Sequence, residues 1–420
     1  MTAGGTLSGR FRPLKNIASV GAVSLHGGFP FEDLLGTQVG RHHTFQASVT
    51  QQSTRLLPLV NNLDISYGLQ YTELKTNHNR TKITEDGGGM IVVTGATGHI
   101  GNVLIRELIT RRQIVRALVM HDDDCRPLAG FEVEIVRGNV TDLKSLESAF
   151  VGADIVFHLA GIVTIMPSMK KVLERVNVGG VRNVATACRT SGVRRLVYTS
   201  SVHAIAEPPH GTVIDESQPF DPDHVLGDYA RSKACATLLL LEEVRKGGLD
   251  AVICCPTGVI GPWDYGISNV GQLILDFASG HLKSYVRGAY DFVDVRDVAN
   301  GLILAAEKGQ PGRHYIFSGA QIQVPELMKE LERDIGYAAP TYEIPSAIAR
   351  VAGVLASVYY RLIRRRPVFT AYSIDVLRSN SQVSSARARE ELGFIARPWQ
   401  ESIRDHVEWF RVEGMLPKRR

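Results

Sequence analysis

The sequence predicts an α/β protein with a doubly wound, mostly parallel sheet and a smaller C-terminal lobe. Three observations predict it. From Met90 onward, short apolar runs alternate with stretches of helical spacing. The first run leads into a glycine-rich turn at 95–101. The apolar runs are short and continuous, which is typical of parallel strands covered by helices on both faces.

The expected elements follow in order. A strand at 91–94 precedes the glycine-rich turn, and the helix at 101–112 repeats apolar residues at helical spacing, namely Val103, Leu104, Leu108 and Ile109. Further strands are expected at 114–120, 133–136, 155–160, 195–199 and 251–255. Further helices are expected from 143 onward, where Leu146 and Phe150 are apolar, at 176–190 and at 229–246. The sequence shows no internal repeat and no heptad array.

Residues 1–89 differ from the rest of the chain. They are rich in Gly, Ser, Thr, Asn, Gln and His, lack sustained periodicity and end in Asp-Gly-Gly-Gly. We expect a disordered extension, or a misassigned gene start, with Met90 as the functional start. A targeting peptide is an alternative because the segment is poor in acidic residues, although its arginines are sparse.

The composition is that of an ordinary globular protein, with 44% hydrophobic and 21% charged residues. A formal charge of +4 is too small to indicate a nucleic-acid partner. The five cysteines are scattered and form no Cys-x-x-Cys pair, which fits free thiols in a reducing compartment. We therefore expect a cytoplasmic protein, with Cys254 and Cys255 as buried strand residues.

No uncharged apolar stretch reaches the roughly 18 residues that a transmembrane helix needs, and the N-terminus lacks the pattern of a secretory signal. The best candidate for membrane contact is 344–366, which ends in three arginines. Its uninterrupted apolar core, 351–360, is about half a bilayer long. A basic amphipathic helix could lie on an anionic surface, but we expect a helix that covers a substrate pocket.

Gly95, Gly98 and Gly101 form a G-x-x-G-x-x-G turn between a strand and a helix. A dinucleotide pyrophosphate needs such a tight turn, close approach of the backbone and a helix N-terminus. An ordinary glycine-rich turn is the alternative, which the second strand at the expected distance disfavours.

Tyr229 and Lys233 lie one helical turn apart. A tyrosine needs help to act as an acid or base because its usual pKa is about 10, and a nearby ammonium favours the phenolate. Tyr-x-x-x-Lys alone is more often a surface turn. Together with the glycine turn and a strand that ends in Thr-Ser-Ser at 199–201, it indicates nicotinamide-dependent chemistry at a carbonyl or alcohol.

Several short motifs stand in a family's order: TGATGHIG at 94–101, GNVTD at 138–142, HLAG at 158–161, VNVG at 176–179, YTSS at 198–201, YARSK at 229–233 and PTGVIGP at 256–262. With them the chain resembles the extended short-chain dehydrogenase/reductase (NAD-dependent epimerase/dehydratase) family from Met90 to about Trp409. FVDVRDVA at 292–299 and ELGF at 391–394 make it similar to the dihydroflavonol-reductase-like branch, which is related to 3β-hydroxysteroid dehydrogenases and sugar-nucleotide epimerases.

The resemblance implies a Rossmann-type NAD(P)-binding domain at 90–260 and a mainly substrate-binding lobe at 261–420, with some segments returning to the core. It implies that Asn139 and Val140 flank the adenine. The other implied cofactor contacts are Gly95, Thr97, Gly98, His99, Ile100, Gly101, Leu159, Ala160, Gly161, Ser200, Tyr229, Lys233, Pro256, Gly258 and Val259.

The choice between NAD and NADP depends on the residues after the second strand, where an acidic residue binds the ribose hydroxyls and an arginine suits a 2′-phosphate. Met120 stands where reductases of the resembling branch often have arginine, and Asp122–Asp124 follow it. These carboxylates would repel a phosphate, whereas Arg116 is close in sequence. We expect NAD and keep NADP as the alternative.

The catalytic group is expected to be Ser201, Tyr229, Lys233 and Asn177. Tyr229 would exchange a proton with the substrate oxygen, and Lys233 would lower the tyrosine pKa and hold the nicotinamide ribose. Ser201 would hydrogen-bond the substrate oxygen, with Ser200 as the alternative or as a cofactor-side neighbour. By resemblance, Asn177 helps to organise a water and backbone relay near the lysine.

Other polar residues have simpler interpretations. His158 is expected to be buried and hydrogen-bonded. For His203 the sequence supports a place in the lining of the substrate pocket and a place outside it equally. The stretch 291–297 is expected to be a structural strand and helix start. No cluster of His, Cys, Asp and Glu has metal-ligand spacing, so no metal is expected.

The substrate class is less determined. Aromatic residues after Gly261 would form the walls of the pocket, namely Trp263, Tyr265, Tyr285 and Tyr290. A sugar nucleotide would want arginines for its diphosphate, whereas a flat hydrophobic alcohol would want apolar walls. Arg287 and Arg296 form no dense cluster, and Cys255 replaces the arginine that is frequent in the family.

We therefore expect an NAD(P)-dependent oxidoreductase for a ketone or secondary alcohol. The alternative is a nucleotide-sugar epimerase or dehydratase that uses bound NAD without net redox. A non-catalytic nucleotide-sensing protein is disfavoured because Ser201, Tyr229 and Lys233 are all present. The expected partner is a small-molecule substrate, with a homodimer left open.

Overall fold

The computed structural model describes residues 89–164, 169–351, 375–377 and 379–417. The expected extension at 1–89, apart from Gly89, and most of the membrane candidate at 344–366 lie outside these residues. Within the described ranges, no helix has the length and apolar character needed to cross a bilayer.

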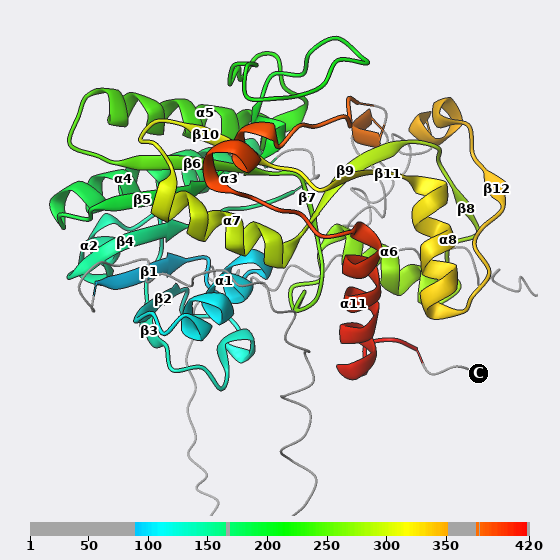
Figure 1. The fold of residues 1–420 in the computed structure, drawn as a ribbon, viewed down its shortest axis with the longest axis horizontal. Helices are drawn as coiled ribbons and strands as arrows, with labels where there is room; N and C mark the ends of the chain where they lie inside the picture. The colour runs from blue at the N-terminus through cyan, green and yellow to red at the C-terminus, as the bar shows by residue number, and fades with distance from the viewer. Residues whose placement is uncertain (1–88, 165–168, 352–374, 378, 418–420) are drawn as a thin grey trace, which may run out of the picture. The chain divides into compact units, whose positions relative to one another are not determined.

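A seven-stranded parallel sheet forms the centre of the fold (Figure 1), which confirms the predicted fold class. Its strand order is β10-β6-β5-β4-β1-β2-β3. The strands are β1 (Met90–Thr94), β2 (Val115–Val119), β3 (Glu134–Arg137), β4 (Ala153–His158), β5 (Arg195–Thr199), β6 (Ala251–Pro256) and β10 (His314–Phe317). From β1 the chain runs outward through β2 and β3, and it then returns to the other side of β1 to form β4. The switch point of the sheet is therefore between β1 and β4, and ligands of such sheets bind there.

Helices cover both faces of the sheet. The helices α1 (His99–Thr110) and α7 (Val295–Lys308) pack on one face, whereas α2 (Leu143–Ala149), α4 (Gly179–Thr190) and α5 (Gly227–Arg245) pack on the other (Figure 1). Successive β1 residues point to opposite sides, so that Ile91 and Val93 enter the α1/α7 core and Val92 enters the other. This burial on both faces explains why the strands are continuous apolar runs.

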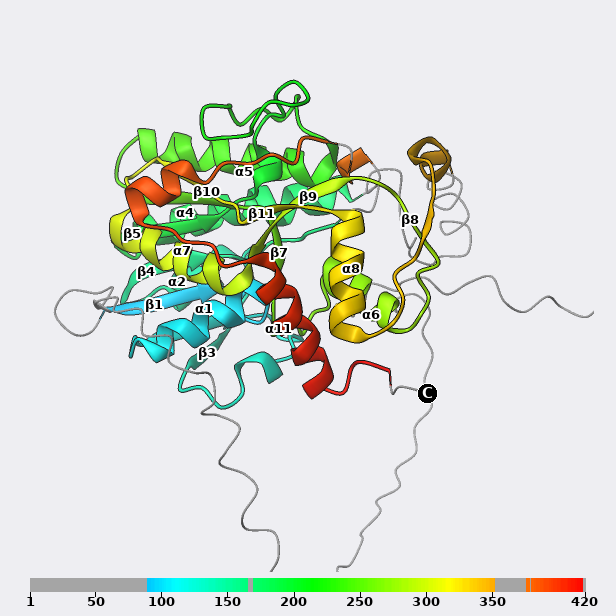
Figure 2. The same cartoon turned by 45° about the vertical axis from the view of Figure 1, so that its right-hand side comes forward.

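A smaller sheet and three helices lie beyond the C-terminal ends of the central strands (Figure 2). The small sheet has the order β11-β9-β7 and consists of β7 (Gly258–Ile260), β9 (Ala289–Asp294) and β11 (Ala320–Gln323). Beside it are a two-stranded sheet, β8 (Ser284–Tyr285) with β12 (Tyr342–Glu343), and the helices α6 (Asn269–Ala278), α8 (Val324–Ile335) and α11 (Trp399–Val412). These helices and the small sheet share a third apolar core.

The described chain also contains short helical turns: η2 (Arg126–Leu128), α3 (Lys170–Leu173), η3 (Glu174–Val178), η4 (Val202–Ala204) and η5 (Ala388–Leu392). The helix expected at 176–190 therefore begins as a π-helical turn, η3, and becomes α-helical only at Gly179. The stretch 291–297 is a strand end and helix start, as expected, because the Asp294 side chain caps α7. Cys254 and Cys255 are buried in β6, and all five cysteines are free.

Candidate active site

The glycine-rich turn follows β1 and is closely packed. Gly95 has a φ of +70°, and a Cβ there would lie 2.7 Å from the Ala160 backbone nitrogen. A Cβ on Gly101 would lie 2.1 Å from the Gly95 carbonyl oxygen. Because these distances are shorter than any non-bonded contact allows, only glycine lets α1 and the end of β4 approach the turn.

Gly98 has a different environment. A Cβ there would meet a single neighbour, the Gly95 oxygen at 3.2 Å, and otherwise open space. Gly98 is the N-cap residue of α1, and no side chain caps that helix. The first-turn N–H groups and the positive end of the helix dipole are thus exposed at the switch point, as a pyrophosphate requires. These residues fit a dinucleotide.

The residues next to this turn come from the ends of β2 and β3. Asp123 Oδ2 accepts hydrogen bonds from the Met120 N–H at 2.9 Å and from the Thr97 hydroxyl at 3.3 Å. Arg116 is engaged elsewhere, since it pairs with Glu134 at 2.9 Å and donates to a carbonyl of the α2 end. A carboxylate, and not that arginine, therefore lies beside the glycine turn.

The residues expected to flank the adenine follow β3, and the expected cofactor contacts Leu159, Ala160 and Gly161 follow β4. Asn139 uses its Oδ1 to accept from the Thr141 N–H and hydroxyl, each at 2.9 Å, and Val140 is buried against Gly180. At the end of β4, the Leu159 N–H donates to the Thr94 carbonyl at 3.2 Å and the Ala160 N–H to the Thr94 hydroxyl at 3.2 Å. His99 turns its ring to the Pro262 carbonyl at 3.0 Å, so only its backbone faces the turn.

The expected catalytic lysine, Lys233, is buried beside Gly161. Lys233 Nζ donates to the Thr199 carbonyl at 2.8 Å, and burial lowers the pKa of Lys233 to about 8. A Cβ on Gly161 would lie 3.6 Å from that Nζ and 3.2 Å from Asn177 Oδ1. The structure therefore brings Gly161, Asn177 and Lys233 together. Tyr229 lies one turn before Lys233 on α5.

Asn177 belongs to the π-helical turn η3 and links two segments. Its Nδ2 donates to the Ile162 carbonyl at 3.1 Å and to the Ser232 hydroxyl at 3.0 Å, while its Oδ1 accepts from the Ile162 N–H at 2.8 Å. It thereby ties the segment that follows β4 to the helix that carries Tyr229. A π-helical turn frequently marks a functional site.

The two serines at the end of β5 have different surroundings. Ser200 Oγ lies 2.7 Å from the Thr237 hydroxyl inside the core. Ser201 begins the turn η4, and its Oγ accepts the His203 backbone N–H at 3.2 Å, which leaves its hydroxyl hydrogen to donate elsewhere. The Ser200 hydroxyl is therefore bonded within the core, whereas the Ser201 hydroxyl is bonded to the backbone of the turn η4.

The two histidines considered as site residues, His158 and His203, are both neutral at pH 7. His158 is buried, with Nδ1 2.8 Å from the Thr94 hydroxyl, and burial lowers its pKa to about 3. This confirms the structural interpretation of His158. His203 lines a pocket, where its Nε2 lies 2.6 Å from the Tyr290 hydroxyl and burial lowers its pKa to about 4.

We call that pocket the inner pocket. Its described lining is Val202, His203, Ile205, Glu207, Ile214, Val225, Leu226, Thr257, Tyr290, Asp291, Val376, Ser379, Asn380, Ser381 and Val383. It adjoins Ser201 through η4 and Tyr229 through the start of α5. Among these described lining residues there is no lysine and no arginine, and most of the residues next to the catalytic segments are aliphatic.

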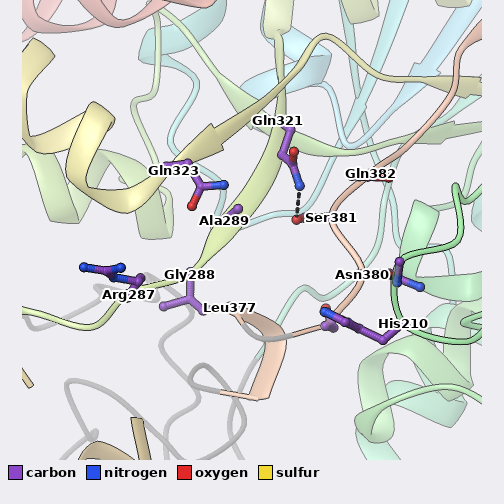
Figure 3. A pocket seen from close by; sticks show the side chains of 12 residues that line it. His210, Arg287, Gly288, Ala289, Gln321, Gln323, Leu377, Asn380, Ser381 and Gln382 are labelled. Carbon is purple, nitrogen blue, oxygen red and sulfur yellow. Dashed lines mark hydrogen bonds between the residues drawn. The ribbon is translucent and has the colours of Figure 1, made fainter. Parts of the chain in front are cut away.

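A second hollow of about 530 Å³, the outer pocket, shares Ser379, Asn380 and Ser381 with the inner one (Figure 3). Its other described lining residues are His210, Gly211, Arg287, Gly288, Ala289, Gln321, Gln323, Leu377 and Gln382. Gln321 Nε2 donates to Ser381 Oγ at 2.6 Å, and Arg287 pairs with Glu343 at 2.8 Å. The described lining of the outer pocket thus includes amide and hydroxyl side chains and one arginine that is paired with Glu343.

Of the four aromatic residues expected to form the substrate walls, only Tyr290 is among the described lining of the two pockets. Trp263 and Tyr265 contact Arg106, and the Tyr285 hydroxyl bonds to Glu343 at 3.5 Å, whereas Tyr290 does line the inner pocket. The described lining of the inner pocket mixes aliphatic side chains with polar ones.

Asp291 was expected to be purely structural, and it also lines the inner pocket. It accepts from the Ser318 hydroxyl at 2.9 Å, and burial raises its pKa to about 6. Only spatial pairing across many residues reveals this role. The described part of the chain contains no group of three or more His, Cys, Asp or Glu that could hold a metal ion.

Pro256 and Gly258 join the central sheet to the small one. Pro256 ends β6, and β7 starts at Gly258 and includes Val259. A Cβ on Gly258 would lie 2.6 Å from the Tyr290 ring, so this glycine lets the Tyr290 ring pack directly on β7.

Comparisons with known proteins agree with this geometry. The model of the NAD dependent epimerase/dehydratase family matches residues 91–317. The chain is 37% identical over 330 residues to sterol demethylase protein B of Methylococcus capsulatus, which covers 77% of this chain and 99% of that protein. It is 29% identical over 328 residues to a putative dihydroflavonol 4-reductase of Synechocystis, covering 77% and 95%. The crystal structure of gox2253 superposes with a TM-score of 0.70 at 31% identity, covering 79% of this chain and all of that one, 100%.

The family match spans more than half of the chain. In the structure, the glycine turn at 95–101 packs against Ala160, and Gly161 lies next to Lys233. The relatives include reductases and dehydrogenases, and several structural neighbours are complexes with NAD. The chain therefore belongs to the NAD-dependent epimerase/dehydratase family of extended short-chain dehydrogenases/reductases and is an NAD(P)-dependent oxidoreductase.

Proposed function

We propose that the chain oxidises a secondary alcohol, or reduces the corresponding ketone, on a hydrophobic ring system of the sterol kind. The observation that carries this proposal is that the lining residues of the inner pocket nearest in sequence to Ser201 and Tyr229 are aliphatic apart from His203, namely Val202, Ile205, Val225 and Leu226. Apolar walls with a few placed polar groups suit a hydrophobic ligand. The name of the Methylococcus relative, a sterol demethylase protein, points to the same class of substrate.

In the proposed mechanism, the glycine turn at 95–101 and the residues around Gly161 and Lys233 would hold a nicotinamide dinucleotide, which would supply the hydride acceptor or donor for the carbinol carbon. Ser201 donates a hydrogen bond to the alcohol oxygen, since its Oγ already accepts from His203. Tyr229 takes the hydroxyl proton as general base, or supplies it in the reverse direction. Lys233 holds a positive charge near it, which favours the phenolate.

Asn177 acts as a positioning residue in this proposal. Because it hydrogen-bonds both Ile162 and Ser232, it keeps the segment after β4 against α5. Gly161 then stays next to Lys233, and its lack of a side chain leaves room there for a nicotinamide ribose. We propose that Ser200, by contrast, supports the site through Thr237.

The proposed cofactor preference is NAD. Asp123 holds a carboxylate beside Thr97, at the edge of the glycine turn. A carboxylate can accept from ribose hydroxyls and would repel a 2′-phosphate. Calorimetric titration with both dinucleotides tests this, and tighter binding of NADP than of NAD would contradict it.

A sugar nucleotide fits the site less well because its diphosphate would need arginines. Arg296 is held by Asp294 and Asp405, each at 2.7 Å, and Arg287 by Glu343. Purified enzyme with NAD should form NADH with hydrophobic ring alcohols and not with UDP-glucose. Conversion of a sugar nucleotide without net NADH formation would refute the proposal.

We further propose a dinucleotide-binding domain at 90–260 and a mainly substrate-binding lobe at 261–420, to which β10 is an exception because it returns to the central sheet. A cytoplasmic location is also proposed, and the five free cysteines support it.

A further inference from the structure

The His203 ring is fixed in the inner pocket from two directions. Its backbone N–H donates to Ser201 Oγ at 3.2 Å, and its Nε2 lies 2.6 Å from the Tyr290 hydroxyl on β9. The ring centroids of His203 and Tyr290 are 5.8 Å apart. A side chain held in this way loses little conformational freedom when a ligand binds to it.

The ring lies in a pocket whose described lining mixes aliphatic and polar side chains. Its neighbours in the inner pocket include Val202, Ile205, Val225 and Leu226. Burial keeps the imidazole neutral at pH 7, so the ring carries no charge. Because Nε2 contacts the Tyr290 hydroxyl, Nδ1 is the ring nitrogen that would meet a ligand. A neutral, buried polar edge favours a neutral ligand group that can hydrogen-bond to it, such as a hydroxyl or carbonyl oxygen.

The position of His203 indicates which part of the substrate it would meet. His203 and Ser201 belong to the same turn, η4. With Ser201 holding the reacting oxygen, as the proposed function requires, His203 lies two residues further along the chain and lines the adjoining pocket, which puts it within reach of substrate atoms near the reacting carbon. We propose that His203, anchored by Tyr290, binds a second oxygen function of the substrate, carried on a carbon next to the reacting one. This inference rests on the proposed function.

Such a contact makes His203 a specificity-determining residue. A site built to hydrogen-bond a substrate oxygen rejects the analogue that lacks it, because the polar groups of the site are then buried without a partner. We expect the enzyme to prefer ring alcohols that carry the neighbouring oxygen by roughly 10- to 100-fold in kcat/KM.

The test compares two hydrophobic ring alcohols that differ only in a keto or hydroxyl oxygen next to the carbinol carbon. Their kcat/KM ratio is measured with the unmodified enzyme and with His203→Phe, which keeps the backbone N–H to Ser201. Tyr290→Phe removes only the anchoring hydroxyl and serves as the second variant, with folding checked by thermal unfolding. Tyr285→Phe is the matched control because its hydroxyl contacts Glu343 and lines neither pocket.

We expect the ratio to fall close to 1 in His203→Phe, to fall several-fold in Tyr290→Phe and to stay unchanged in Tyr285→Phe. Equal losses for both alcohols in the first two variants would assign the pair a purely structural role and overturn the inference. The absence of any preference in the unmodified enzyme would also overturn it. If neither alcohol is turned over by the unmodified enzyme, the proposed function itself fails, and the inference with it.

Discussion

Replacement of Gly98 separates the fold of the glycine turn from its capacity to bind a dinucleotide. Gly98 has φ −69° and ψ 167°, which alanine adopts without strain. The added Cβ would lie 3.2 Å from the Gly95 oxygen, so a shift of a few tenths of an ångström accommodates it. The rest of the Cβ surface faces the open side of the turn, where the backbone must approach the pyrophosphate.

We therefore expect Gly98→Ala to fold with a nearly unchanged melting temperature and to bind the dinucleotide roughly 10- to 100-fold more weakly, which corresponds to about 1.4–2.8 kcal/mol. Gly98→Val, with two further methyl groups, should abolish binding. Isothermal titration calorimetry on the folded variants measures both effects.

Two other glycines provide the controls. Gly266→Ala adds a Cβ with no atom within 4 Å and should leave both folding and binding unchanged. Gly101→Ala adds a Cβ 2.1 Å from the Gly95 oxygen and should destabilise the fold itself. Unchanged dinucleotide affinity in both folded Gly98 variants would refute the placement of the cofactor.

Three further predictions concern other parts of the chain. Acidification from pH 7 to pH 5 should lower the free energy of unfolding by about 2 kcal/mol through His158 alone. The pKa of His158 is about 3 in the folded chain and 6.5 in the unfolded chain, so only the unfolded chain takes up the proton in this range. Urea titrations at both pH values should show a correspondingly smaller loss in His158→Gln. Lys233→Met should lower turnover by about 10²-fold or more and move the remaining pH optimum upward, since Tyr229 loses the cation that favours its phenolate; an unshifted pH profile would count against this role. Removal of residues 1–88 should leave melting temperature, oligomer size in gel filtration and dinucleotide affinity unchanged, because β1 starts at Met90 and its partner strands lie later in the chain; a melting temperature several degrees lower would contradict this.

The central sheet could be predicted because its signals are local. Each strand is a short apolar run, and the glycine turn is a pattern of seven residues between one strand and one helix. The contact of Lys233 with the end of β5 follows from the parallel order, which brings the C-terminal ends of the strands to one edge.

The parts that escaped prediction depend on contacts between distant residues. The π-helical turn at 174–178 is only five residues long, too short a stretch for hydrophobic spacing to reveal it. The small sheet pairs three short strands across long stretches of chain. The roles of Ser200 and His203 depend on Thr237 and Tyr290, whose proximity no local pattern encodes. Aromatic composition suggested the pocket walls, but Trp263 packs against Arg106 instead.

The turnover of Tyr229→Phe tests the central claim most directly, because this change deletes one hydroxyl and leaves the glycine turn untouched. Single-turnover oxidation of a hydrophobic ring alcohol is followed by NADH absorbance, and NAD affinity is measured on the same preparation. The account predicts nearly unchanged NAD affinity with turnover reduced by about 10²- to 10⁴-fold. Near-normal turnover in a folded, NAD-binding Tyr229→Phe enzyme would contradict it.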